Sequence, residues 1–287
     1  MAFRTDLALE VLENGGQTAH AVQTETQLEG FRLTRVRLTR EDGGRPPGRY
    51  ETLSLDGLLR REEDAFARAC RAVAQTLRRL APPLDPRAPV LVIGLGNRAV
   101  TPDALGPLCC QNVLATRHLV ERSPAQFRAF RPVAVLAPGV LGTTGVETGE
   151  IVAGVIAHVR PALVLAVDAL AARRLSRLMR TLQLTDTGIV PGSGVGNART
   201  ALTGQALGVP VLALGVPTVV DGATLAADIA RQSGASCEAL DDLRTPVLVT
   251  TRDVDQQVAD AARVIGYGVN LFLHPGLDIA DIDLFLS

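Results

Sequence analysis

The sequence predicts an α/β fold, a mostly parallel twisted sheet with helices on both faces. The first observation is the apolar run from Pro89 to Ile93, which is bounded by proline and glycine and is typical of a strand buried on both faces. The second is that strand-like apolar runs and helix-like segments alternate after it, as they do in parallel sheets. Glycine-rich loops follow two of the strands, so these loops are expected beside the same sheet edge, where ligands of open sheets bind.

The core is expected to contain five strands, at residues 89–94, 132–137, 162–167, 209–215 and 246–250. Four helices are expected between and after them, at residues 102–120, 147–159, 222–232 and 252–273. Residues 177–186 have the character of one more strand, a small β segment inserted antiparallel.

The N-terminal part predicts a β-hairpin followed by a helix. Residues 31–39 and 50–55 are expected to pair across the turn Glu41–Gly44, and one helix should run from Asp56 or Gly57 to about Leu80. We therefore expect a single domain, with an N-terminal hairpin and helix, an α/β core and a loosely held C-terminal tail. These three parts span residues 1–86, 87–274 and 275–287.

Composition narrows the possible functions. The 287 residues include 29 basic and 30 acidic side chains, and every basic residue other than histidine is arginine, which excludes lysine Schiff-base chemistry and a P-loop lysine. The sequence contains no cluster of basic residues, so nucleic-acid binding is not expected. No apolar run of membrane-spanning length and no signal pattern occurs, so no membrane partner is expected and the protein is interpreted as cytoplasmic. The four cysteines lack C-x-x-C spacing and predict buried thiols.

Two aspartates are the strongest candidates for catalysis. Thr101 and Pro102 suit the N-cap and first position of a helix, which would present Asp103 at the end of the first core strand. Asp168 closes the run L-V-L-A-V-D, at the end of another core strand. Two convergent carboxylates can share the work of hydrolysis, one ionised and accepting a proton from water, the other protonated and donating one. The alternative for each is a capping or strand-end hydrogen bond.

Other polar residues in the loops at this edge are expected to line or support a substrate groove. The loop 138–150 offers two acids that alternatively serve only the first turn of a helix. The loop 186–197 can bind an oxyanion through its backbone N–H groups, but Pro191 and Val195 break the nucleophile-elbow pattern around its serine. The candidate groove residues are Asn97, Glu147, Glu150, Asp186, Ser193, Asn197 and Asp221.

A nucleotide site is the competing interpretation of the turn at residues 94–99. G-L-G-N-R-A matches G-x-G-x-x-[GA], but the helix is expected to start only at Thr101, and the second strand ends in Ala137-Pro138 without an acid for a ribose. No metal or other cofactor is predicted, since no H-E-x-x-H spacing occurs. His274 follows the last core helix and is interpreted as a charged C-terminal cap.

Six motifs in order resemble the germination proteases of endospore-forming bacteria, over nearly the whole chain. They are G-L-G-N-R-A-V-T-P-D-A-L-G-P (94–107), T-R-H-L (116–119), A-P-G-V-L-G-T-T-G-V-E-T-G-E-I (137–151), A-V-D-A-L-A (166–171), D-T-G-I-V-P-G-S-G-V-G-N (186–197) and G-V-P-T-V-V-D-G (215–222). The resemblance implies an endopeptidase that initiates degradation of small acid-soluble spore proteins during germination. It further implies a fold related to the hydrogenase maturation endopeptidases.

The resemblance also implies the catalytic residues and the biological setting. The two essential aspartates of the family correspond to Asp103 and Asp168. In the hydrogenase maturation enzymes a histidine joins two acids at a metal, and the lack of an obvious counterpart here favours a metal-free aspartate dyad over a carboxylate-bound metal. A homotetramer, made as a zymogen in the forespore and active in the spore core, is expected. Only Met1–Phe3 precede the R-T-D-L-A segment that follows the family's propeptide, so zymogen control stays an open expectation. A member that binds spore proteins without cutting them is a third possibility.

Overall fold

The computed structural model describes residues 5–10, 20–196, 199–233 and 247–287. Nine strands in this part of the chain form one sheet in the order β1-β2-β3-β7-β8-β6-β4-β5, and β9 pairs with β8. The strands are β1 (Ala21–Leu28), β2 (Phe31–Leu38), β3 (Gly48–Ser54), β4 (Val90–Gly94), β5 (Val133–Leu136), β6 (Leu163–Ala172), β7 (Thr181–Thr185), β8 (Val211–Asp221) and β9 (Leu248–Val249). The predicted α/β class is thus confirmed.

The sheet is mixed, and its parallel part is the predicted core. β5, β4, β6 and β8 run parallel to one another. β7 pairs antiparallel with both β8 and β3, so the predicted inserted segment joins the N-terminal strands to the core. The predicted hairpin is β2 and β3, with Val36 opposite Tyr50, but β1 adds a third antiparallel strand that the sequence analysis missed.

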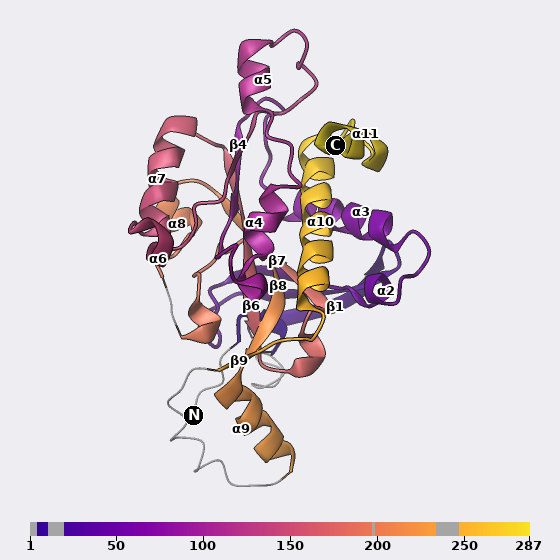
Figure 1. Cartoon of the computed structure of the whole chain (residues 1–287), viewed down its shortest axis with the longest axis vertical. Helices are drawn as coiled ribbons and strands as arrows, with labels where there is room; N and C mark the ends of the chain where they lie inside the picture. Colours follow the sequence, from indigo (N-terminus) through magenta and orange to yellow (C-terminus); the bar gives the residue numbers. More distant parts are fainter. Residues whose placement is uncertain (1–4, 11–19, 197–198, 234–246) are drawn as a thin grey trace.

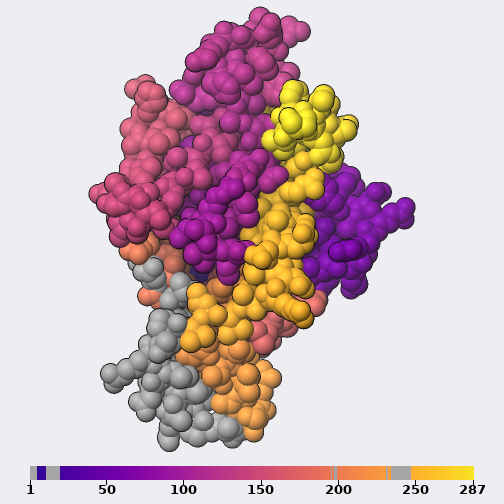
Figure 2. Space-filling view, in the orientation of Figure 1, coloured from indigo at the N-terminus to yellow at the C-terminus, as the bar shows by residue number. Residues whose placement is uncertain are grey.

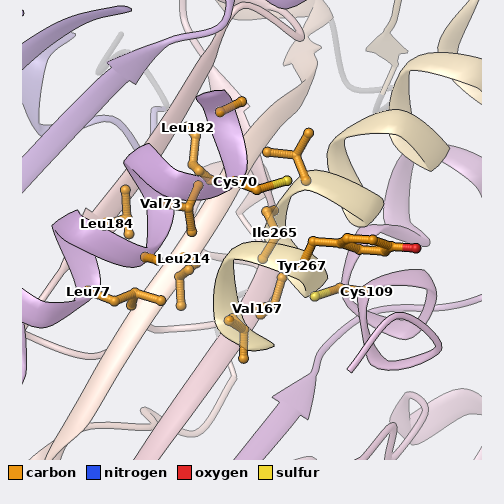
Figure 3. Packing of buried hydrophobic residues seen from close by; sticks show 14 of the residues in the cluster. Cys70, Val73, Leu77, Cys109, Val167, Leu182, Leu184, Leu214, Ile265 and Tyr267 are labelled. Atoms are coloured by element: carbon orange, nitrogen blue, oxygen red, sulfur yellow. The ribbon is translucent and has the colours of Figure 1, made fainter. Parts of the chain in front are cut away.

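Helices cover both faces of the sheet (Figure 1). On one face α3 (Ala65–Leu80), α4 (Leu105–Cys110) and α10 (Val254–Leu273) enclose the main apolar core. Cys70, Val73 and Leu77 on α3 point toward Ile265 on α10 and toward the strands, as Figure 3 shows. On the other face α7 (Thr148–Val159) packs through Val152 against β4 and β6. The remaining α-helices are α2 (Asp56–Leu59), α5 (Arg117–Arg122), α6 (Leu141–Thr144), α8 (Gly204–Leu207), α9 (Gly222–Gln232) and α11 (Ile279–Leu286).

Two predicted helices are divided in the structure. The segment 56–80 forms α2 and α3, separated by Arg61 and Asp64, whose φ angles are positive. The segment 102–120 forms a 3-10 turn at Thr101–Asp103, then α4 and α5. The side-chain amide of the fully buried Asn270 on α10 donates to the Asn112 carbonyl and accepts the Leu114 N–H. These bonds replace the helical hydrogen bonds of the two backbone groups, so the chain between α4 and α5 is not helical there.

The C-terminal tail is not loose, which corrects the sequence-based expectation. α11 begins with a capping box, in which Asp278 and Asp281 each accept the other's backbone N–H. Ile282 is fully buried in the main core, and the Tyr267 hydroxyl donates to the Asp283 carboxylate. Figure 2 shows α10 between the α4 region and the α2–α3 region, with α11 at its upper end.

Candidate active site

The site begins where β4 leaves the sheet. β4 ends at Gly94, opposite Val167 of β6, and the Leu95 N–H donates to the Val167 carbonyl (2.8 Å). β6 continues five residues further, to Ala172, so Asp168 lies inside a long strand, whereas the sequence analysis placed it at a strand end. The departure of β4 therefore opens the sheet beside Asp168.

Close backbone contacts hold Asp103 beside this opening. Gly96 has φ +110°, and a Cβ there would collide with the Asp103 carbonyl oxygen. A Cβ at Gly106 would collide with the Leu95 backbone and the Val167 carbonyl, so α4 packs directly on the sheet. The predicted Thr101 cap is wrong, because Val100 holds the N-cap position and no side chain caps the 3-10 turn.

The environments of the two carboxylates differ. Burial raises the pKa of Asp103, and a 2.7 Å hydrogen bond from the Asn97 N–H to its Oδ2 opposes that rise. Asp168 is only 5 % exposed, and burial, followed by the negative charges of Asp103 and Asp6, raises its pKa well above the ordinary range. The Ala169 N–H donates to Asp168 Oδ1 at 2.9 Å, which opposes the rise. Asp168 is therefore the group that retains its proton to higher pH.

Both aspartates line one cavity of about 500 Å³. Its walls come from the segment between β4 and the 3-10 turn Thr101–Asp103, the α6–α7 region, β6, the loop after β7 and the β8–β9 region. Glu147 and Arg199 form an ion pair on the wall, with 3.6 Å between Oε1 and Nη1. The two carboxylates therefore lie at the same cavity, as the sequence predicted. The cause differs, because they meet at a gap in the sheet and not at two strand ends.

Asp6 is a third aspartate of this cavity, and the sequence did not single it out. Its Oδ2 accepts the Ala171 N–H (2.9 Å), and its Oδ1 accepts the Ser193 hydroxyl (2.7 Å). The Arg45 guanidinium lies 3.7 Å from Oδ1. The available signal was the R-T-D-L-A segment, whose polar Asp6 stands before an apolar stretch that is buried in the structure.

Among the other candidates, two lie at the cavity. Asn97 lines it and accepts the Ala99 N–H with its side chain, which shapes the turn after β4. Glu147 lines it as well and is also the N-cap of α7. Glu150 is exposed, does not line the cavity, and accepts the Glu147 N–H at 3.3 Å, so its role is the helix-start role that the sequence left open.

Three of the remaining candidates lie outside this cavity. Asp186 binds Arg49 at the start of β3, with 2.7 Å between Oδ2 and Nε. Asp221 accepts the backbone N–H and the hydroxyl of Thr224 at the start of α9. Ser193 lines a neighbouring cavity of about 300 Å³ and acts on the site only through Asp6. Asn197 lies outside the described residues.

The described residues contain no group of three histidine, cysteine or acidic side chains placed to hold a metal ion. The turn at residues 94–99 faces the two carboxylates, and the helix that follows it starts only at Leu105. Negative charge at this position would repel a dinucleotide pyrophosphate, which weighs against the nucleotide interpretation.

Comparison with known proteins places the chain in a family. Residues 8–232 match the family described as germination protease. The chain belongs to the germination protease family. A germination protease of Caldanaerobacter subterraneus is 40% identical over 100% of this chain and 98% of its own length. One from Clostridium perfringens is 36% identical over 99% of both chains, and one from Bacillus velezensis is 44% identical over 79% of this chain and 65% of its own length.

As a member of this family, the chain has a protease role in spore germination. Among solved structures, a [NiFe] hydrogenase maturation protease from Thermococcus kodakarensis overlaps with 64% of this chain and 93% of its own, at a TM-score of 0.36 and 16% identity. In the described part of the chain, no helix is both long and apolar enough to cross a membrane.

Proposed function

We propose that this chain is an endopeptidase that initiates the degradation of small acid-soluble spore proteins during germination, with Asp103 and Asp168 activating water. The observation that supports it most is that both carboxylates line one cavity of about 500 Å³ while burial and neighbouring negative charge raise the pKa of Asp168 further than that of Asp103. The spore-protein substrate follows from the family resemblance, as do the forespore location, the zymogen and the homotetramer. One sheet joins the N-terminal strands β1, β2 and β3 to the core, which supports a single catalytic domain.

The geometry suggests a role for each aspartate. Ionised Asp103 accepts a proton from water as the water oxygen bonds to the scissile carbonyl carbon, and protonated Asp168 donates to the carbonyl oxygen. The tetrahedral intermediate then collapses and the C–N bond breaks. The leaving amine receives the proton that Asp103 holds, and a hydroxyl proton returns to Asp168, which regenerates both groups.

The test is cleavage of a purified small acid-soluble spore protein by the metal-stripped full chain, with EDTA present throughout. Activity that survives, together with loss of activity in Asp103→Asn, supports two aspartates acting on water. Loss in EDTA that a divalent ion restores would replace the dyad with a carboxylate-bound metal. Absence of cleavage in every condition would leave a spore-protein binder that does not cut.

A further inference from the structure

Over a short distance beside the aspartate pair, no described segment pairs with one edge of β6. On the side of β4, the last contact is the bond from the Leu95 N–H to the Val167 carbonyl. Further along the same strand the N-terminal segment takes the neighbouring place: the Asp6 N–H donates to the Ala171 carbonyl (2.8 Å), and the Asp6 carboxylate accepts the Ala171 N–H. Ala169 lies between these contacts, and no described strand pairs with it on that side.

The carbonyl of Ala169 points into this gap. Backbone groups two residues apart in a strand point to the same side, and the carbonyls of Val167 and Ala171 both bond on the side of β4. The Ala169 N–H is used by Asp168 Oδ1. The carbonyl oxygen is therefore the acceptor that this edge offers, and Ala169 is half-buried in the wall of the cavity.

The gap has the length of a short extended peptide and passes between the two carboxylates. With a rise of about 3.3 Å per residue, the carbonyls of Val167 and Ala171 are roughly 13 Å apart. Asp168 borders the gap from β6, and Asp103 borders it from the chain that leaves β4. A peptide that takes the place of β4 here therefore has its main chain beside both groups.

We propose that this edge of β6 is the main-chain binding site of the substrate, where an extended peptide adds to the sheet and donates one backbone N–H to the Ala169 carbonyl. The inference rests on the proposed peptidase function and specifies the form in which the substrate is bound. Main-chain bonding of this kind gives affinity that does not depend on side chains and selects extended, unfolded segments. A helical segment, whose N–H groups are internally bonded, is excluded.

Substitution in the enzyme cannot remove a backbone carbonyl, so the test changes the substrate. A spore-protein peptide is compared with analogues in which an ester oxygen replaces one amide N–H at a time. Ester replacement at one position should lower kcat/KM about threefold to thirtyfold, because the peptide loses a hydrogen bond there and places an ester oxygen against the Ala169 carbonyl oxygen. The two neighbouring positions are the matched controls, since their N–H groups point away from β6 and their replacement should have little effect.

Binding of the same analogues to full-length Asp168→Asn, measured by fluorescence anisotropy, gives a readout that does not require cleavage. The same single position should weaken binding there. If the parent peptide is cleaved but ester replacement has the same effect at every position, or no effect at any, edge binding is contradicted and the peptidase function stands. A parent peptide that is bound but not cleaved by the unaltered chain contradicts the proposed function, and the position dependence of binding still decides the edge site.

Discussion

The backbone N–H of Asn97 donates a 2.7 Å hydrogen bond to Oδ2 of Asp103. Burial raises the pKa of Asp103, and this bond opposes that rise because it stabilises the ionised carboxylate. The pKa of Asp168 is raised further, since Asp168 is more deeply buried and has the negative charges of Asp103 and Asp6 nearby. The chain therefore distinguishes the two acids by their surroundings, although both are the same residue type.

Replacement of Asp168 by asparagine should abolish cleavage and stabilise the fold. Loss of a proton donor typically costs about 10²- to 10⁴-fold in rate. The raised pKa of Asp168 means that its contribution to stability is full below the ordinary aspartate value of 3.8 and is lost as pH rises through the folded value. The substituted amide cannot ionise, so thermal unfolding at neutral pH should give a higher Tm than in the unaltered chain, with the difference shrinking toward pH 3.8. An unchanged or lower Tm at neutral pH would contradict the assigned environment.

Gly96 controls the position of Asp103, so Gly96→Ala should lower activity strongly. Its φ of +110° is unfavourable for a side chain, and the new Cβ would collide with the Asp103 backbone. We expect a fall of at least about tenfold in kcat/KM, because small displacements of catalytic groups have large effects. Gly142→Ala is the matched control, since Gly142 lines the same cavity but a Cβ there meets no atom within 4 Å. Equal activities of the two variants would show that the turn does not position Asp103.

The charge of Asp6 should set the alkaline limit of activity through Asp168. Asp6→Asn removes one negative charge, which lowers the pKa of Asp168 and moves the alkaline limb of the kcat/KM profile to lower pH. Arg45→Gln should move it to higher pH, because the guanidinium 3.7 Å from Asp6 then no longer offsets that charge. The other charged groups of the cavity, Glu147 and Arg199, are unchanged in both variants.

Ser193→Ala is the control for this pair. It removes a hydrogen bond to Asp6 without changing any charge, so its alkaline limb should stay in place. Movement of the limb in the same direction in both Asp6→Asn and Arg45→Gln would show that packing, and not charge, links Asp6 to the reaction.

Local sequence patterns predicted the elements in which apolar residues form a continuous run or recur with a helical period. β4, α7 and α10 lie within one or two residues of their expected bounds, because an uninterrupted apolar run and a helical apolar stripe are local properties. β1 was missed because most of its side chains are exposed and its pairing is supplied by β2. The capping box of α11 was a local signal in the sequence, but the tail had been interpreted from its acidic character alone.

Of the residues predicted for the site, the two aspartates, Asn97 and Glu147 line the cavity. The ends of β6 and β8 were placed too early, so the gap beside Asp168, which depends on where β4 leaves the sheet, could not be foreseen. The contact of Asp6 with Ala171 joins residues 165 positions apart, a relation to which no local pattern responds. Asp186 and Asp221 stand in or beside glycine-rich segments, yet Asp186 pairs with the distant Arg49 and Asp221 with Thr224 three residues later, and neither lines the cavity.

His274 should make the fold sensitive to mild acid, contrary to its interpretation as a charged cap. The imidazole is 2 % exposed, and burial, together with the charge of Arg131, lowers its pKa from 6.5 to about 4. The stabilising contribution of the neutral imidazole is therefore full above pH 6.5 and is lost as pH falls. Between pH 6.5 and about 4 the unfolding free energy should fall by about 3 kcal/mol. His274→Gln should lose less stability than the unaltered chain from pH 6.5 to 4 in urea titrations. His118→Gln, at an exposed position, is the control, and an equal loss in both variants would contradict the assignment.

The last helix should be an integral part of the core, which one pair of substitutions can test. Ile282 is fully buried against the residues of α3 and α10, whereas Leu284, two positions later on the same helix, is 73 % exposed. Ile282→Ala should therefore lower the unfolding free energy by about 2–4 kcal/mol, through lost burial and the cavity that remains. Leu284→Ala should change it by less than about 0.5 kcal/mol, since it removes only solvated surface. Both variants place alanine on the same helix, so a similar small effect in the two would mean that α11 contributes no packing energy, and a large effect confined to Ile282 would show that residues 275–287 fold with the core.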